Sequence, residues 1–495
     1  MENQNNLTEN LSRREALKKI AVVGGALSAF SFLNQDLLAQ QEAKTDDGEV
    51  DMIASADLKT VIKNGSVYHQ QQLKKLYVGI TEQNTIKVSE KPLTAKNIID
   101  AKGKIVSQGF VDILADNAGS PETTYRIFEK YKLTDGATSV LQMHGGSAYP
   151  AAFHQKFDPL PHYVNYGVSV FVMILRLRFM SFADRMKYTE KALQEGALGV
   201  AHSIEYQPTS YEELVGYAKL AAKYDRPFFL HLRYSAKETE LEGVKEAIKL
   251  SKETGARIHI DHLHSTGGTF NMPKALELIQ NANLTGGQIT TCVYPYSYWA
   301  TYLISKRFDP GWQKNFGLTY SDLTVVGTGQ KLTEGTFNAY RSRPGLLVAV
   351  PEGTMAFDKT IDLALQTDFC MIGSDGGIES EPKANNHPRG AGCFATAIRH
   401  GIDMGMSMEK TLSKVTTLPC RLMKGVMDTR NDIANGKVAD IVIFNPKTIN
   451  GKASVANPNQ YSEGIDHIFV NGTLVYEDNK ILASKGKPIR YTPQK

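Results

Sequence analysis

The chain has 495 residues, of which 42% are hydrophobic and 22% charged, and its formal net charge is +4. This composition excludes a wholly disordered chain and provides enough apolar residues for one large core or two smaller ones. The 56 basic and 52 acidic residues nearly balance, so no nucleic-acid partner is expected. Four cysteines without CxxC spacing argue against a disulfide scaffold and a zinc ribbon.

Residues 1–39 have the pattern of an export signal. Arg13 and Arg14 precede an uncharged run over 20–32, and a small-residue exit follows near Ala39. The paired arginines are typical of the twin-arginine type. The apolar run is too short to cross about 30 Å of hydrocarbon as a permanent helix. We therefore expect a periplasmic protein without stable membrane insertion, with an uncleaved N-terminal anchor as the alternative.

Short strand-like runs occur near both ends of the chain. A polar linker over 40–57 leads into the first of them, where Asn64-Gly65 is a hairpin turn signal. Runs rich in β-branched residues lie at 58–68, 75–80, 97–106, 439–444 and 464–472. Because neither end is large enough to bury much surface alone, we predict one β-sandwich built from residues 58–107 and 431–495.

Between these ends, apolar runs alternate with helical stretches. The strand-like runs lie at 139–142, 168–175, 227–231, 257–262, 288–293, 346–350 and 369–374. Such alternation is typical of parallel βα units, and at this length it predicts a (β/α)8 barrel over residues 108–430. Polar residues at the carboxyl ends of its strands are then the first candidates for an active site.

Three polar residues end such runs. His231 and His262 each terminate an apolar run, and neutral imidazoles on neighbouring strand ends can bind one metal ion. Asp375 follows the run at 369–374 and can bind a metal or take a proton from water. The alternatives are buried histidines that bond to backbone groups, and an aspartate that caps a helix.

Several motifs accompany these residues, among them Val61-Ile62-Lys63-Asn64-Gly65, Gly109-Phe110-Val111-Asp112, Gly373-Ser374-Asp375-Gly376 and His387-Pro388-Arg389-Gly390. Together they resemble the amidohydrolase superfamily, and within it the N-acyl-D-amino-acid deacylase (D-aminoacylase) branch, from about residue 58 to 490. The resemblance implies a metal-dependent (β/α)8 barrel with a small β-sandwich from both chain ends. It also implies hydrolysis of a C–N amide bond in a small, anionic substrate.

The resemblance also implies roles for individual residues. His231 and His262 match the histidines that hold a tightly bound zinc ion, and Asp375 matches the general base. Arg389 matches a residue that binds the substrate carboxylate, and Tyr294 matches a tyrosine of the same substrate pocket. Glu205 and Arg233 are expected in the pocket wall or in a structural ion pair. The donors considered for the oxyanion of the reaction are His202, His264 and Tyr294.

The chain departs from the family pattern at its metal-binding positions. Leu114 and Asp116 stand where the first strand normally carries His-x-His, and Gly145 stands at the usual cysteine position, with His144 beside it. His264 replaces a family lysine that binds the substrate carboxylate, and we expect His264 to contact the substrate in its place. A leucine cannot bind zinc, so we expect one zinc ion, held by His231 and His262 and completed by His144 or Asp116.

Three interpretations follow from these departures. The first is a D-aminoacylase-like hydrolase with one metal ion. The second keeps the barrel and pocket but acts on another bond, such as a cyclic amide or the acetamido group of a sugar. The third is a non-catalytic ligand-binding relative. Joint retention of His231, His262, Asp375 and Arg389 favours an enzyme.

Overall fold

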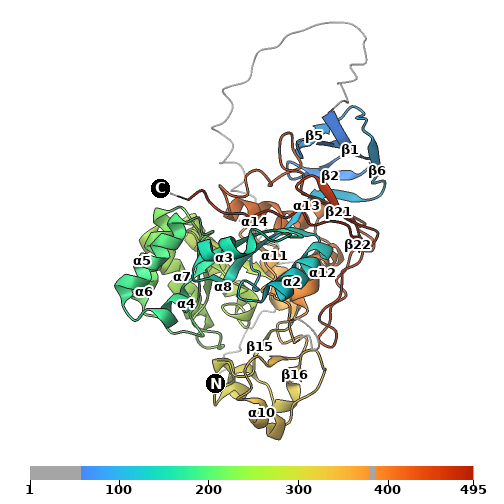
Figure 1. Ribbon diagram of the computed structural model, residues 1–495. Coiled ribbons are helices and arrows are strands. Elements are labelled where there is room, and N and C mark those ends of the chain that lie inside the picture. Colours follow the sequence, from blue (N-terminus) through green and yellow to red (C-terminus); the bar gives the residue numbers. More distant parts are fainter. Residues whose placement is uncertain (1–56, 380–384, 494–495) are drawn as a thin grey trace, which may run out of the picture. The chain divides into compact units, whose positions relative to one another are not determined.

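Eight parallel strands with helices between them form a barrel (Figure 1). The computed structural model describes residues 57–379 and 385–493, so the predicted export signal and nearly all of the linker lie outside the described residues. In sheet order the strands are β18 (Cys370–Ile372), β14 (Ile289–Val293), β13 (Ile258–Ile260), β12 (Phe228–His231), β11 (Val200–Ser203), β10 (Asn165–Phe171), β9 (Ala137–Ser147) and β8 (Phe110–Asp112).

Burial explains why these segments are strands. Every residue of β8, β11, β12, β13 and β18 is buried, as expected where helices cover a parallel sheet on one face and side chains fill the barrel on the other. The main helices of the barrel region are α2 (Glu122–Thr134), α3 (Pro150–Phe157), α4 (Val172–Arg178), α5 (Phe182–Gln194), α6 (Tyr211–Lys223), α7 (Glu240–Thr254), α8 (Met272–Leu284), α11 (Ile361–Leu365), α12 (Arg389–Asp403), α13 (Met408–Val415) and α14 (Thr417–Leu422).

A buried ionic cluster joins the first barrel strand to the last. Asp112 at the end of β8 accepts hydrogen bonds from the Ser374 backbone N–H (3.1 Å) and hydroxyl (2.6 Å). Lys132 of α2 places its Nζ 2.9 Å from an Asp112 carboxylate oxygen, and both side chains are almost fully buried. A parallel bridge between Ala115 and Gly376 continues the pairing. The cluster therefore fixes the chain on either side of Ser374, immediately before Asp375.

The barrel differs from the predicted one at three runs. Residues 346–350 were expected as a barrel strand, but β17 (Leu347–Ala349) pairs antiparallel with β15 (Ala300–Tyr302) and β16 (Thr324–Val325) in a separate small sheet. That sheet belongs to an insertion between β14 and β18 that also carries α9 (Trp312–Phe316) and α10 (Glu334–Tyr340). The barrel strand that the prediction lacked is β11. The predicted run 168–175 ends as helix, because α4 begins at Val172.

Strands from both chain ends form two further sheets. One contains β5 (Ile86–Ser89), β4 (Tyr77–Thr81), β1 (Leu58–Lys63) and β6 (Asn97–Asp100). The other contains β22 (Lys480–Ile481), β21 (Thr473–Glu477), β20 (Ile465–Val470), β19 (Ile441–Phe444), β7 (Ile105–Gln108), β2 (Ser66–His69) and β3 (Gln72–Lys74). The antiparallel pairing of β7 with β19 joins the two ends of the chain. The predicted fold, a barrel with a β-structure from both ends, is confirmed.

Two further observations complete the description. The C-terminal segment leaves the second sheet and runs along the barrel, where the Ile489 N–H donates to the Tyr166 carbonyl (2.7 Å). Within the described ranges, no helix combines the length and the hydrophobicity that a membrane span requires.

Candidate active site

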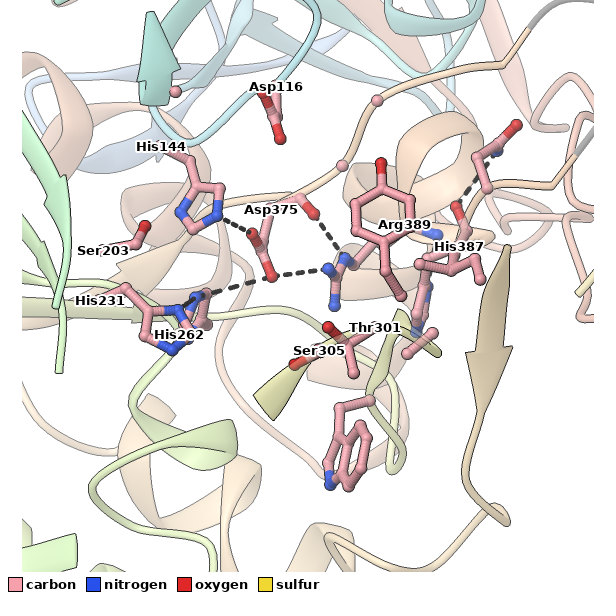
Figure 2. Close-up of a pocket in the computed structure, with 18 of the residues that line it drawn as sticks. Asp116, His144, Ser203, His231, His262, Thr301, Ser305, Asp375, His387 and Arg389 are labelled. Carbon is pink, nitrogen blue, oxygen red and sulfur yellow. Dashed lines mark hydrogen bonds and ion pairs between the residues drawn. The ribbon is translucent and has the colours of Figure 1, made fainter. Parts of the chain in front are cut away.

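The carboxyl ends of the barrel strands surround a cavity of about 590 Å³ (Figure 2). Six of the seven residues predicted for the site line it: His144 in β9, His231 at the end of β12, His262 after β13, and Tyr294, Asp375 and Arg389. This is the end of a (β/α)8 barrel at which active sites are found. The fold therefore brings together residues that are more than 240 positions apart in the sequence.

Three histidines form a compact cluster in this cavity. Ring nitrogens of His144, His231 and His262 all lie within 4.8 Å of one another. The closest pair is His231 Nδ1 and His262 Nε2, at 3.1 Å. Two nitrogens bound to one tetrahedral zinc at about 2.1 Å each lie roughly 3.4 Å apart. The histidine spacing thus suits a shared metal ion with little rearrangement.

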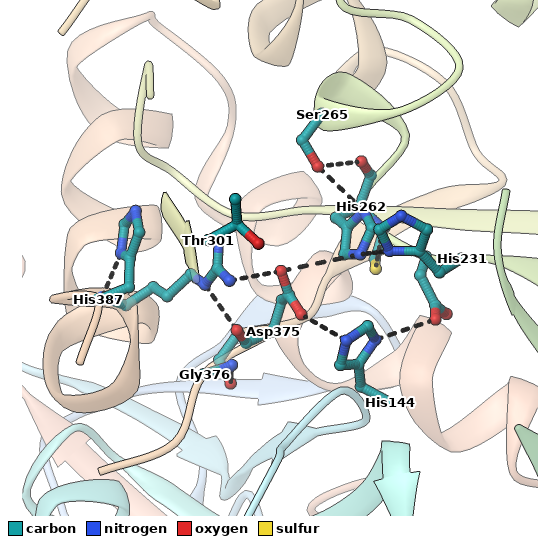
Figure 3. Close-up of polar contacts among 12 residues, drawn as sticks. His144, His231, His262, Ser265, Thr301, Asp375, Gly376 and His387 are labelled. Carbon is teal, nitrogen blue, oxygen red and sulfur yellow. Dashed lines mark hydrogen bonds and ion pairs between the residues drawn. The ribbon is translucent and has the colours of Figure 1, made fainter. Parts of the chain in front are cut away.

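Each histidine of the cluster is held by its other ring nitrogen, as Figure 3 shows for His262 and Ser265. His231 Nε2 lies 2.7 Å from the Glu205 carboxylate, His262 Nδ1 lies 3.0 Å from the Ser265 hydroxyl, and His144 Nδ1 lies 3.2 Å from the Asp261 carboxylate. Such bonds fix the orientation of metal-binding imidazoles and leave the opposite nitrogen free. The free nitrogens here are those that face one another across the cavity.

Burial sets the charge of two of these histidines. It lowers the pKa of His231, and it lowers that of His262 well below the usual range, so both rings are neutral and carry a lone pair. Burial opposes the charge of His144 as well, but Asp375 first and then Asp261 and Asp116 raise its pKa to about 9. A cation binding at the cluster must therefore displace a proton from His144.

Glu205 does not line the cavity but forms an ion pair and contacts His231. Its carboxylate contacts His231, the Ser235 hydroxyl and Arg307, whose Nε lies 3.1 Å away. Burial works against ionisation, but Arg307 and the hydrogen bonds from His231 and Ser235 hold the Glu205 pKa at about 2. Arg233, expected beside it, instead pairs with Glu246 at 2.8 Å. Glu205 therefore remains an anion behind His231.

Asp375 links the histidines to Arg389. Its Oδ1 lies 3.4 Å from His144 Nε2, and its Oδ2 lies 3.8 Å from His262 Nε2 and 2.7 Å from Arg389 Nη2 (Figure 2). Arg389 Nε also donates to the Asp375 backbone carbonyl at 2.6 Å. Asp375 has φ of 49°, which non-glycine residues rarely adopt. Arg389 therefore holds both the carboxylate and a strained backbone.

The expected substrate contacts are met only in part. Arg389 lies over the Tyr294 ring, with its Cζ 4.3 Å from the ring centroid, and both residues line the cavity. His264 was predicted to bind substrate, but it is fully buried against Tyr294, with ring centroids 4.1 Å apart, and it does not line the cavity. Its place in the 3-10 turn Leu263–Ser265 directs it behind Tyr294.

Burial places His202 away from the cavity and agrees with the expectation that Leu114 binds no metal. His202, considered as an oxyanion donor, bonds the Thr209 hydroxyl at 2.7 Å and lies outside the cavity lining. Leu114, at a position where the family carries histidine, is completely buried in an apolar cluster with Val111, Leu141 and Met143. The segment after the first strand offers the cavity the polar side chains of Asp116, Asn117 and Ser120, and no histidine.

Sequence reasoning missed three residues around the cluster: Asp261, Ser265 and Arg307. Asp261 directly precedes the predicted ligand His262, and Ser265 follows it by three residues, so both lie close to that ligand in the sequence. Arg307 lies in the insertion after β14, where no strand-end rule applies. Its contact with Glu205 could be found only from the folded chain.

Known proteins of similar sequence are deacylases that act on N-acylated D-amino acids, by their names. The chain is 29% identical over 300 residues to an N-acyl-D-glutamate deacylase from Alcaligenes xylosoxydans xylosoxydans, covering 58% of this chain and 59% of that enzyme. The resemblance to the D-aminoacylase branch is confirmed. The chain spans about three-fifths of the length of the curated relatives that it matches. No protein-family model matches the chain.

Solved structures with a similar fold cover most of this chain. The N-acyl-D-glutamate deacylase of Bordetella bronchiseptica, solved with zinc and a phosphonate inhibitor that mimics the tetrahedral intermediate, matches with a TM-score of 0.74 and 22% identity. A D-aminoacylase matches with a TM-score of 0.75 and 21% identity. Each match covers 88% of this chain and all of the other. At this level of identity, these matches establish the D-aminoacylase fold.

Proposed function

We propose that this chain is a metal-dependent hydrolase that cleaves the C–N amide bond of an N-acyl-D-amino acid. One observation carries the proposal: ring nitrogens of His144, His231 and His262 lie within 4.8 Å of one another, and those of His144 and His262 face the Asp375 carboxylate in the same cavity. The similarity to N-acyl-D-glutamate deacylase and D-aminoacylase supports the choice of bond. The substrate is then a small molecule with an anionic group.

The proposed cofactor is one zinc ion held by His144, His231 and His262. Three protein ligands with one open position form a standard catalytic zinc site, and the neutral His231 and His262 rings suit it. When bound, the ion supplies Lewis acidity towards an amide carbonyl and towards water. Buried Leu114 offers no ligand for a second ion on the first strand.

Asp375 is the proposed proton carrier. It lies beside the histidine cluster, where its carboxylate can take a proton from the attacking water and then return it to the departing nitrogen. The C–N bond breaks as the new C–O bond is completed, so the products are a carboxylate and an amine. The proton that water gives up thus reaches the leaving group by way of one residue.

Arg389 is the proposed anchor for the substrate anion. Arg389 Nε donates to the Asp375 backbone carbonyl, and Nη2 contacts the Asp375 carboxylate. The guanidinium has five N–H donors, so others remain for a substrate carboxylate. The guanidinium stacks on the Tyr294 ring, with Arg389 Cζ 4.3 Å from the ring centroid. Because His264 lies outside the cavity lining, Arg389 is the proposed anion contact beside Tyr294.

A substrate panel tests the proposal. Zinc-loaded protein should release amine from N-acyl-D-amino acids and much less from N-acyl-L-amino acids, measured by amine-specific labelling. Cyclic amides and N-acetylated sugars test the alternative of a different bond within the same cavity. If a fully metal-loaded protein turns over no member of the panel, the hydrolase proposal fails and a ligand-binding relative replaces it.

We also propose that the protein is exported to the periplasm. Arg13 and Arg14, outside the described residues, head a short apolar run as a twin-arginine signal requires. Replacing both arginines with lysine should leave full-length precursor in the cytoplasm, measured by cell fractionation and mass analysis of the N-terminus. A single Lys18→Arg change, which retains Arg13 and Arg14, is the control. Undiminished periplasmic protein from the double variant would contradict this route.

A further inference from the structure

The His144–Asp261 pair shows a feature that the proposed function does not use. His144 Nδ1 lies 3.2 Å from Asp261 Oδ2, and the Asp261 side chain is only 2% exposed. The second oxygen, Oδ1, is buried and has no hydrogen-bond partner among the described residues. A buried carboxylate is costly unless it is paired, so a contact with a single imidazole calls for a functional explanation.

We propose that Asp261 is a positioning residue for metal binding, which acts by holding His144. The proposal rests on the proposed function, because it assumes that His144 is a ligand. The Asp261 contact occupies Nδ1 and turns Nε2 towards Asp375, 3.4 Å away, on the side where His262 Nε2 also faces Asp375. A carboxylate behind a metal-binding imidazole fixes the tautomer and makes the ring a better donor.

Asp261 reaches the cluster only through His144. Asp261 and Asp375 are buried and contact the two ring nitrogens of His144, one on each side. Asp375 is also paired with Arg389 at 2.7 Å, whereas the contact of Asp261 among the described side chains is His144. Asp261 therefore acts on a bound ion by orienting that imidazole.

The local chain explains how Asp261 reaches His144. Asp261 directly follows β13, and its N–H donates to the Leu230 carbonyl of β12 at 3.0 Å, which continues the strand pairing by one residue. His262 then turns into the left-handed region, with φ of 30°. The strand thus ends with Asp261 facing His144 while His262 joins the cluster, so a single turn supplies one ligand and positions another.

Zinc affinity of the purified holoprotein and its variants tests this role, measured by competition with a chromogenic chelator. Asp261→Asn keeps the shape but weakens the contact, so zinc affinity should fall 10- to 100-fold, the usual effect of losing such a partner. Asp116→Asn is the matched control, since it removes a carboxylate of the cavity lining that makes no hydrogen bond to His144. It should change zinc affinity by less than Asp261→Asn does.

A double variant separates positioning from direct binding. In a His144→Ala background, Asp261→Asn should have almost no further effect on zinc affinity. A second full loss in that background would show that Asp261 acts on the ion without His144, and would overturn the proposal. The visible spectrum of the Co²⁺-loaded protein gives an independent reading, because Asp261→Asn should change the bands that report ligand geometry.

The outcomes distinguish this inference from the proposed function. If the wild-type protein binds no zinc, both fail. If it binds zinc and hydrolyses its substrate, but Asp261→Asn leaves affinity and the Co²⁺ spectrum unchanged, only the role of Asp261 fails. Thermal unfolding of the metal-free variants checks that each one is folded.

Discussion

We expect the mature chain to bind one zinc ion tightly and the His231→Ala/His262→Ala double variant to bind none. Within the described residues, His144, His231 and His262 form the one group of ligand-type side chains close enough to share an ion. The double change removes two of the three ligands and leaves His144 alone, which cannot hold zinc in a tetrahedral site. Elemental analysis of purified protein after removal of loosely bound metal gives the stoichiometry.

A matched control keeps this result specific. His467 lies on β20, away from the barrel cavity, where it contacts Glu477 at 3.1 Å. His467→Ala should leave the metal content at one ion per chain. A stoichiometry of two would contradict the prediction of a single ion, because the buried Leu114 offers no ligand on the first strand. Metal retained by the double variant would contradict the assignment of His231 and His262 as ligands.

The fold was largely predictable because its strands are buried on both faces. Short apolar runs between helical stretches identified most of the barrel, and β-branched runs at both ends identified the second sheet. The failures have a common cause. The run at 346–350 is as apolar as a barrel strand, yet it pairs with strands of an insertion, and hydrophobicity alone contains no information about the partner strand.

The site was predictable where strand ends determine position. His231, His262 and Asp375 each follow an apolar run, and parallel strands bring such ends to one face. His144 lies within β9 rather than at its end, so only its place beside the family's cysteine position indicated it. The sequence did not indicate the position of His264, because a turn of three residues places its ring against Tyr294. Loop geometry of this kind is decided by tertiary contacts.

The largest catalytic effect is expected from Asp375→Asn. An asparagine can fill the same space but cannot accept the proton from water, so kcat should fall by about 10²- to 10⁴-fold, the usual contribution of a general base. Metal content should stay at the wild-type level, because the three clustered histidines that are the proposed ligands are unchanged in this variant. Steady-state kinetics with elemental analysis of the same sample measure both quantities. A variant that retains wild-type kcat would exclude Asp375 as the proton carrier.

Arg389→Ala is expected to change both KM and kcat. A residue that only binds the substrate carboxylate should raise KM and leave kcat unchanged, because that contact is shared by the ground and transition states. Arg389, however, also contacts the Asp375 carboxylate at 2.7 Å and its backbone carbonyl at 2.6 Å. Without these contacts Asp375 loses its orientation at a strained φ of 49°, so kcat should fall along with the rise in KM. Arg389→Lys keeps the charge but not the two-point contact, and should restore KM more than kcat. If Arg389→Ala changes KM alone, the contacts with Asp375 do not contribute to catalysis.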